Sequence, residues 1–149
     1  MTVRPNIFSG DFDQERDGDG AVKRQNFVAR KAGSNWIGAT VWELEPGATA
    51  YKYHFHYGEE ELLIVLDGTP TLRTPEGTSE LAPGDVVSFL VGPGGAHQVV
   101  NESDEIVRFL AVSAGEDADI VKYPETGETL VSYQRNRPDG FKEIHGGDA

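Results

Sequence analysis

The chain alternates between short apolar runs and clusters of turn-forming residues along most of its length. The runs are rich in β-branched, leucine and aromatic residues, and the clusters between them are rich in glycine, proline, asparagine and aspartate. No stretch has the sustained apolar period of about 3.6 residues that marks an amphipathic helix. The pattern predicts strands at 27–29, 36–44, 51–56, 62–66, 71–73, 79–81, 86–91, 97–100 and 106–112. An all-β sandwich or closed barrel is therefore expected.

The run 62–66, Leu-Leu-Ile-Val-Leu, is apolar at every position. Successive side chains of a strand point to opposite faces, so both faces of this strand need cover. The interior of the barrel covers one face, and a second sheet or a second subunit covers the other. We therefore expect a homodimer.

The two ends of the chain differ from this β-rich middle. Residues 9–20 are acidic and rich in glycine, and the last four residues are small or polar. With 149 residues the chain has the usual size of one domain, and no linker to a second domain is visible in the sequence. We expect an acidic N-terminal segment at 1–24, a barrel domain at 25–115 and a C-terminal extension at 116–149.

Composition narrows the class of partner. The formal net charge is -12, from 13 basic and 25 acidic residues, which argues against nucleic acid and anionic membrane surfaces. The sequence has no cysteine, no apolar run of membrane-spanning length and no signal-peptide pattern near Met1. We expect a cytoplasmic protein whose partner is a small molecule, with no role for nucleic acid or membrane.

Two of the four histidines, His54 and His56, stand two positions apart in a predicted strand. Such residues share a face, and at about 3.3 Å rise per residue their rings can reach one ion at about 2.0–2.1 Å. Alone, the pair also fits partly exposed polar residues of an amphipathic strand. Lys52 shares this face, where it either holds a substrate anion or lies at a strand edge. The aromatic residues of the opposite face are expected in packing: Tyr51, Tyr53, Phe55 and Tyr57.

A carboxylate follows the two histidines at the start of the apolar strand. Glu61 shares a face with Leu63 and Val65 by alternation, so it points toward the core or its rim. A charge there needs a partner, and a cation held by two imidazoles would supply one. The alternative is that 59–61, three consecutive glutamates, form a solvated acidic turn.

The remaining motif lies after a glycine-rich loop. His97 begins an alternating strand in which it shares a face with Asn101. Alone, His97 would be an ordinary histidine at the start of a strand. His145 lies in the polar tail and has no partner visible in the sequence.

Together these motifs resemble those of the cupin superfamily. The first cupin motif is a glycine, His-x-His, three or four residues, a glutamate, six residues and a glycine, matched here by Gly47, His54, His56, Glu61 and Gly68. The second ends in a histidine separated by three residues from an asparagine, matched by His97 and Asn101. The sequence departs from the pattern in two loops, with six residues instead of the usual five between Gly47 and His54, and Leu90 in place of a proline before a longer loop.

The resemblance, which covers about 36–112, implies a jelly-roll barrel, or double-stranded β-helix, with a metal site at His54, His56, Glu61 and His97. Glu60 would be the ligand if the shorter spacing applied. Three imidazoles and one carboxylate suit one divalent transition metal: Fe, Mn, Zn, Ni, Co or Cu. Lys52 and Asn101 are the candidate substrate-binding residues. Because a histidine binds metal only when unprotonated, we expect metal loss below about pH 6.5.

The chemistry of the site leaves two classes of function open. The first is a metal-dependent enzyme acting on a small carboxylate, diketone, phenol or sugar, with a dioxygenase placed ahead of an isomerase, epimerase or decarboxylase. The second is a metal-assisted module that binds or senses a small molecule without turning it over.

Overall fold

The computed structural model describes residues 4–115, 118–133 and 141–146, and within them the regular structure is β-strand apart from one short helix and one 3-10 turn. In chain order the elements are β1 (Gln14–Asp17), β2 (Val22–Asn26), α1 (Val28–Lys31), β3 (Gly38–Leu44), β4 (Phe55–His56), β5 (Glu59–Asp67), β6 (Thr71–Thr74), β7 (Gly77–Glu80), β8 (Val86–Phe89), η1 (Pro93–Gly95, a 3-10 turn), β9 (Gln98–Val100), β10 (Val107–Gly115), β11 (Ala118–Lys122), β12 (Thr129–Tyr133) and β13 (Phe141–His145).

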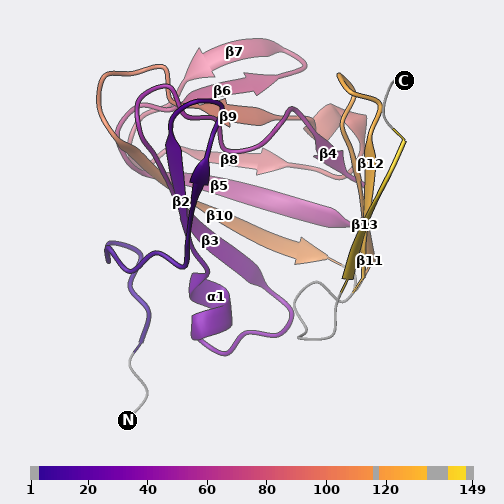
Figure 1. The fold of residues 1–149 in the computed structure, drawn as a ribbon, viewed down its shortest axis with the longest axis horizontal. Coiled ribbons are helices and arrows are strands. Elements are labelled where there is room, and N and C mark those ends of the chain that lie inside the picture. Colours follow the sequence, from indigo (N-terminus) through magenta and orange to yellow (C-terminus); the bar gives the residue numbers. More distant parts are fainter. Residues whose placement is uncertain (1–3, 116–117, 134–140, 147–149) are drawn as a thin grey trace.

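The strands form three antiparallel sheets that together make a jelly-roll barrel. The largest has the order β1-β2-β3-β10-β5-β8, and the smaller ones are β13-β12-β11-β4 and β7-β6-β9. Figure 1 shows β6, β7 and β9 above the long strands β5 and β10, with β11, β12 and β13 seen edge-on at one end. The all-β prediction is confirmed, and so is the jelly-roll fold.

Alternation along the two longest strands decides which side chains fill the barrel. On β5, Leu63 and Val65 are 2% and 1% exposed, and on β10, Val107 and Phe109 are 0% and 2% exposed. The residues that alternate with them along each strand point to the other face of the sheet. The interior cluster also includes Trp42, Leu44, Leu72, Leu81, Phe89 and Val99. This cluster is the hydrophobic core of the barrel.

Two predicted strands have a different structure. Residues 27–29 were expected as a strand, but Val28–Lys31 form the short helix α1, because alanine, arginine and lysine are good helix formers. Of the expected strand 51–56, Phe55–His56 form β4 and His54 makes a single bridge with His97. The alternation used to place side chains at 51–54 therefore does not hold there.

The regions outside the central barrel take part in its sheets. β1 and β2 form a hairpin that extends the largest sheet beyond β3, so the acidic N-terminal segment is partly ordered β-structure. At the other end of the chain, β11 pairs with β4 and continues into β12 and β13. Across the described ranges, no helix has the length and apolar character needed to cross a membrane.

Candidate metal centre

Two segments distant in sequence hold the first pair of rings. The backbones of His54 and His97 exchange two hydrogen bonds, with N···O distances of 3.1 and 2.9 Å. Their ring centroids lie 4.6 Å apart, and both side chains are buried. The ring of Phe89, at the end of β8, stacks on the His97 ring at a centroid distance of 3.6 Å. These contacts fix the position of both imidazoles independently of any bound ligand.

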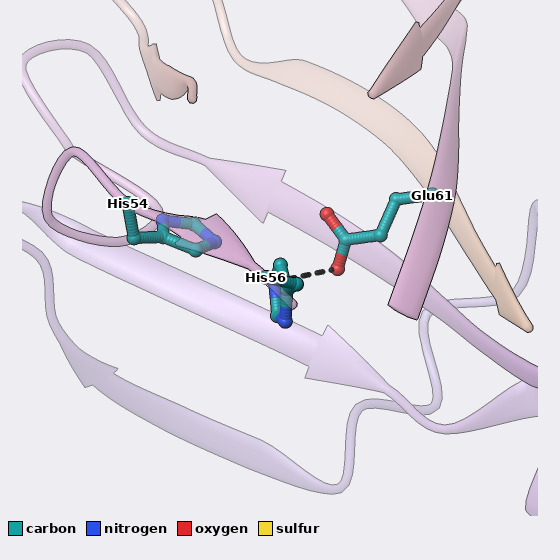
Figure 2. A group of neighbouring side chains, drawn as sticks. All are labelled: His54, His56 and Glu61. Atoms are coloured by element: carbon teal, nitrogen blue, oxygen red, sulfur yellow. Dashed lines mark ion pairs between the residues drawn. The ribbon is translucent and has the colours of Figure 1, made fainter. Parts of the chain in front are cut away.

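The carboxylate of Glu61 lies between the histidines. Its Oε2 is 3.0 Å from His97 Nε2, and its Oε1 is 3.3 Å from His56 Nε2. Ligand atoms of His54, His56 and Glu61 all lie within 4.8 Å of one another. Figure 2 shows these three side chains converging from the segment before β4, from β4 and from β5. The sequence-predicted residues His54, His56, Glu61 and His97 are thus brought together.

The alternative ligand Glu60 lies on the other face of β5. Glu60 is exposed, whereas Glu61 is only partly exposed, and Glu59 is buried with 4% exposure. Because Glu59 and Glu61 stand two positions apart, both point to the inside of the barrel. The glutamate triplet is therefore not a uniformly solvated turn, and Glu60 is excluded as a contact of the histidines by its direction.

Each of the three rings is held by its Nδ1 atom. His54 Nδ1 lies 2.7 Å from the carbonyl oxygen of Lys52, and His97 Nδ1 lies 2.8 Å from that of Gly95. A carbonyl oxygen only accepts hydrogen bonds, so these Nδ1 atoms donate, and the neutral ring keeps its lone pair on Nε2. His56 Nδ1 donates to Asp119 Oδ2 at 2.6 Å. All three rings are therefore oriented by a hydrogen bond from Nδ1, which leaves Nε2 for a metal ion, as is usual for metal-binding histidines.

The residues present fit a divalent transition metal. His56 Nε2 is buried and makes no hydrogen bond of good geometry among the described residues; its contact is the carboxylate of Glu61, with Oε1 at 3.3 Å. In the neutral ring this nitrogen presents a lone pair to a carboxylate, and a cation between the two would remove that unfavourable contact. Three imidazole nitrogens and one carboxylate are a mixed N/O donor set that iron, manganese, nickel, cobalt, copper and zinc accept.

The surroundings shift the proton affinities of the two neighbouring histidines in opposite directions. Burial, reinforced by His97 and His56, lowers the pKa of His54 to about 4. Burial also acts to lower the pKa of His56, but the hydrogen bond to Asp119 and the contact with Glu61 outweigh it and raise that pKa to about 9. For Glu61, burial acts to raise the pKa, but the contacts with His56 and His97 prevail and hold it well below its usual range. Without metal, Glu61 and His56 thus form an ion pair at neutral pH.

The cluster opens into a cavity of about 310 Å³. Its wall is mostly apolar and aromatic, and includes Trp42, Tyr51, Leu63, Phe89, Val99 and Phe109. Among the described residues that line it, Arg30 is the sole lysine or arginine. The histidine and glutamate side chains therefore line a cavity of the size that holds a small molecule.

Neither candidate substrate-binding residue lies on the wall of this cavity. Lys52 is exposed, and its Nζ lies 3.0 Å from Glu128 Oε2 at the rim of a separate depression. Asn101 is fully buried, and its side chain holds a turn by donating to the carbonyl oxygens of Leu44 and Glu105. Its motif position therefore serves the fold, and neither residue lines the cavity beside the histidines.

Sequence reasoning missed three residues of the site. Asp119 lies in the C-terminal extension, at the end of the acidic segment Glu-Asp-Ala-Asp of 116–119, and its alternation with the apolar Val121 was the signal available in the sequence. Glu59 could have been found from its alternation with Glu61. Alternation predicts Tyr51 in packing on the face opposite the histidines, but Tyr51 lines the cavity, and its ring lies 5.9 Å from that of His54. It also packs on Trp42 at a centroid distance of 4.9 Å.

A barrel of this topology with inward histidines and a glutamate defines a class of small-molecule-binding jelly-roll proteins, and comparisons with known proteins agree. The cupin domain family matches residues 40–113. A structure from Acidithiobacillus ferrooxidans, described as a proposed sugar phosphate isomerase, is 30% identical with a TM-score of 0.73, covering 85% of this chain and 77% of that one. The chain belongs to the cupin superfamily.

Two further solved structures resemble the chain. A sugar phosphate isomerase of the cupin superfamily from Silicibacter pomeroyi has a TM-score of 0.75 at 24% identity, covering 83% of this chain and 75% of that one. The polyketide cyclase RemF from Streptomyces resistomycificus has a TM-score of 0.60 at 26% identity, covering 78% and 81%. No curated protein sequence matches the chain.

Proposed function

We propose that this chain is a metal-dependent enzyme whose ion is held by His54, His56, Glu61 and His97 and whose substrate is a small molecule. The observation that carries the proposal is the arrangement of ring nitrogens. Each Nδ1 is engaged by an outer acceptor, and Nε2 atoms of two rings lie within 3.3 Å of the same carboxylate. A bound divalent ion supplies a Lewis acid that polarises a substrate oxygen.

The shape and lining of the cavity favour one class of substrate. An apolar and aromatic wall with Arg30 as its sole lysine or arginine among the described lining residues suits a largely apolar molecule with one or two oxygens. Diketones and phenols have this character, and their oxygens bind a cation well in the enolate or phenolate form. Sugars, which need many hydrogen-bonding partners, would depend on the polar residues that also line the cavity, such as Gln25, Thr40 and Gln98.

The reaction class we favour is a rearrangement without net oxidation, of the isomerase or cyclase type. Two of the similar structures named above share 25% identity or more with this chain. One is described as a proposed sugar phosphate isomerase and the other as a polyketide cyclase. Either reaction needs a polarised oxygen and a proton transfer. A dioxygenase uses the same donor set, and oxygen consumption separates the two.

Elemental analysis of protein purified without added metal is the first test, with His145→Ala as a matched control because His145 is exposed and remote in sequence from the cluster. Metal in the wild type and in H145A, but not in H56A, supports the proposal. Equal metal in all three overturns the ligand assignment. The metal-loaded protein is then screened by thermal shift against diketones, phenols and sugar phosphates, and oxygen uptake is followed with each binder. Binding without turnover of any compound would favour the sensing module.

We also propose that the protein is a homodimer that covers the outer face of β5. Leu62 and Val86 are 40% and 60% exposed on that face. The half-buried Ile64 pairs with Val86, and Leu110 and Val112 of β10 lie beside Ile64 and Leu62. Light scattering at micromolar concentration should report about twice the chain mass of 16.2 kDa, and a monomer would contradict the proposal. Leu62→Lys should shift the protein toward the monomer.

A further inference from the structure

Asp119 contacts the histidine cluster from a strand that lies beyond the residues matched by the cupin domain family. The match ends at 113, and Asp119 is the second residue of β11. Its side chain is 1% exposed. Oδ2 accepts a hydrogen bond from His56 Nδ1 at 2.6 Å, and Oδ1 accepts one from the backbone N–H of Gly58 at 2.9 Å. One carboxylate therefore joins the ring of His56 to the turn that leads into β5.

The pairing of β11 with β4 determines this position. Val121 lies opposite His56 in the register, and the backbone N–H of Tyr57 donates to the carbonyl oxygen of Ile120 at 2.9 Å. Gly58 allows the close approach, since a Cβ atom there would lie 2.6 Å from the carbonyl oxygen of Ala118. A larger residue at 58 would push β11, and with it the carboxylate, away from the ring.

We propose that Asp119 is a positioning residue that fixes the ring of His56, so that Nδ1 keeps a proton whether the ring is charged or neutral, and Nε2 faces Glu61. The part of this inference that concerns metal affinity rests on the proposed function. The C-terminal strand β11 then belongs to the site as well as to the fold. His54 and His97 need no such residue, because backbone carbonyl oxygens hold their Nδ1 atoms.

A carboxylate is required at 119 because two donors meet there. Asparagine has the same shape, but it has one accepting oxygen and an NH₂ group that donates. In D119N either Gly58 N–H or His56 Nδ1–H therefore faces a donor. Alternatively, the neutral His56 ring in D119N carries its single proton on Nε2, which removes the lone pair that a metal ion would need. Each outcome disturbs the ring.

Glu59 is a weaker candidate for the same role. Its Oε2 lies 3.2 Å from His56 Nδ1, compared with 2.6 Å for Asp119. The single proton on Nδ1 is held by the nearer acceptor. We therefore expect Glu59→Gln to perturb the ring less than Asp119→Asn, and the opposite order would transfer the role to Glu59.

The metal test compares Zn²⁺ affinities of wild type, D119N and D85N. Asp85 is the matched control, because its Oδ2 also accepts a backbone N–H, that of Ala82 at 2.8 Å, but in an exposed turn. D119N should bind Zn²⁺ about 10–100-fold more weakly than wild type, the usual effect of removing an outer hydrogen-bond partner of a metal-binding histidine. D85N should bind as wild type does. A D119N dissociation constant within about twofold of wild type overturns the inference.

A second measurement does not depend on metal. With ring nitrogens of the four histidines labelled with ¹⁵N, the metal-free wild type should show a slowly exchanging, far-downfield Nδ1–H signal. The signal should vanish in H56Q, which assigns it, and shift or exchange rapidly in D119N but not in D85N. Its absence from the wild type overturns the inference even if no variant can be purified. If the wild type shows the signal but binds no Zn²⁺, the proposed function fails and the positioning role of Asp119 stands.

Discussion

The two sides of the candidate metal centre hold the same side chain in different ways. On one side, the Nδ1 atoms of His54 and His97 donate to neutral backbone carbonyl oxygens. On the other, His56 Nδ1 donates to the carboxylate of Asp119. The pKa values follow, at about 4 for His54 and about 9 for His56, although both rings are buried. Burial alone does not determine the charge of a histidine, because the charge of its partners decides whether burial is compensated.

Removing a ring from either side should have the largest effect. H54A and H56A should each lose most bound metal, because each deletes one nitrogen donor of the cluster. H145A should retain it, because His145 is exposed and contacts Glu143 at 3.1 Å. Metal content per chain after desalting measures the difference. If H54A retained metal and H56A did not, His54 would not take part in binding.

Neutralising the carboxylate between the two sides should have the next largest effect. E61Q removes the negative charge that lies 3.0 Å from His97 Nε2 and 3.3 Å from His56 Nε2. Its Zn²⁺ affinity should fall by more than the about 10–100-fold expected for an outer partner, because Glu61 is itself proposed as a ligand. E60Q should bind Zn²⁺ as wild type does, because Glu60 is exposed on the opposite face of β5. A larger loss in E60Q than in E61Q would contradict the assignment.

The sequence predicts the proposed metal ligands better than it predicts the groups that hold them in place. His54, His56, Glu61 and His97 could be named from motif spacing, because a β-strand has a fixed side-chain period and the loops only have to bring the strands together. Glu61 shares a face with Leu63 and Val65 as expected, since the alternation of β5 is unbroken. The jelly-roll fold was predicted for the same reason.

Asp119 could not be named in this way. Its contact with His56 spans 63 positions, and the pairing of β11 with β4 depends on the packing of the whole barrel. The placement of Tyr51 failed for a related reason. The chain leaves regular β-structure between Ala50 and His54, so alternation gives no information about direction there. Side-chain alternation therefore predicts the direction of a side chain only within a regular strand.

The protons released on metal binding should sharpen the comparison further. In the metal-free protein at pH 7.5, His56 is protonated and His54 is not, because their pKa values are about 9 and about 4. Zn²⁺ binding should release about one proton per ion, and the apparent affinity should rise about tenfold per pH unit toward pH 9. The reference pKa of histidine predicts that protons compete with the metal only below about pH 6.5. The carboxylate partners of His56 extend this competition to higher pH.

Calorimetric titrations in buffers of different ionisation enthalpy measure the number of protons released. D119N should release fewer protons at pH 7.5, because loss of the carboxylate lowers the pKa of His56. Proton release near zero in the wild type would show that His56 is neutral before binding and would remove the distinction between the two sides of the site.

The stability of the metal-free protein should have its maximum near pH 6.5, between the folded pKa values of the two rings. His56 has a folded pKa of about 9, above its reference of 6.5, so its contribution is complete below pH 6.5 and is lost as pH rises toward 9. His54 has a folded pKa of about 4, so its contribution is complete above pH 6.5 and is lost as pH falls toward 4. The lowered pKa of Glu61 adds to the acid loss, because a carboxylate held ionised in the fold stabilises it only while the unfolded chain is also ionised.

Urea unfolding in the presence of a chelator at pH 5, 6.5 and 9 tests these signs. The loss between pH 6.5 and 9 should be on the order of 2–3 kcal/mol, because each tenfold difference in proton affinity between folded and unfolded chains contributes about 1.4 kcal/mol. H56Q should flatten the alkaline side and leave the acid side, whereas H54Q should flatten part of the acid side alone. H145Q should change neither side. If H56Q kept the full alkaline loss, that loss would come from other groups, and the carboxylate-held ring would not be charged in the metal-free protein.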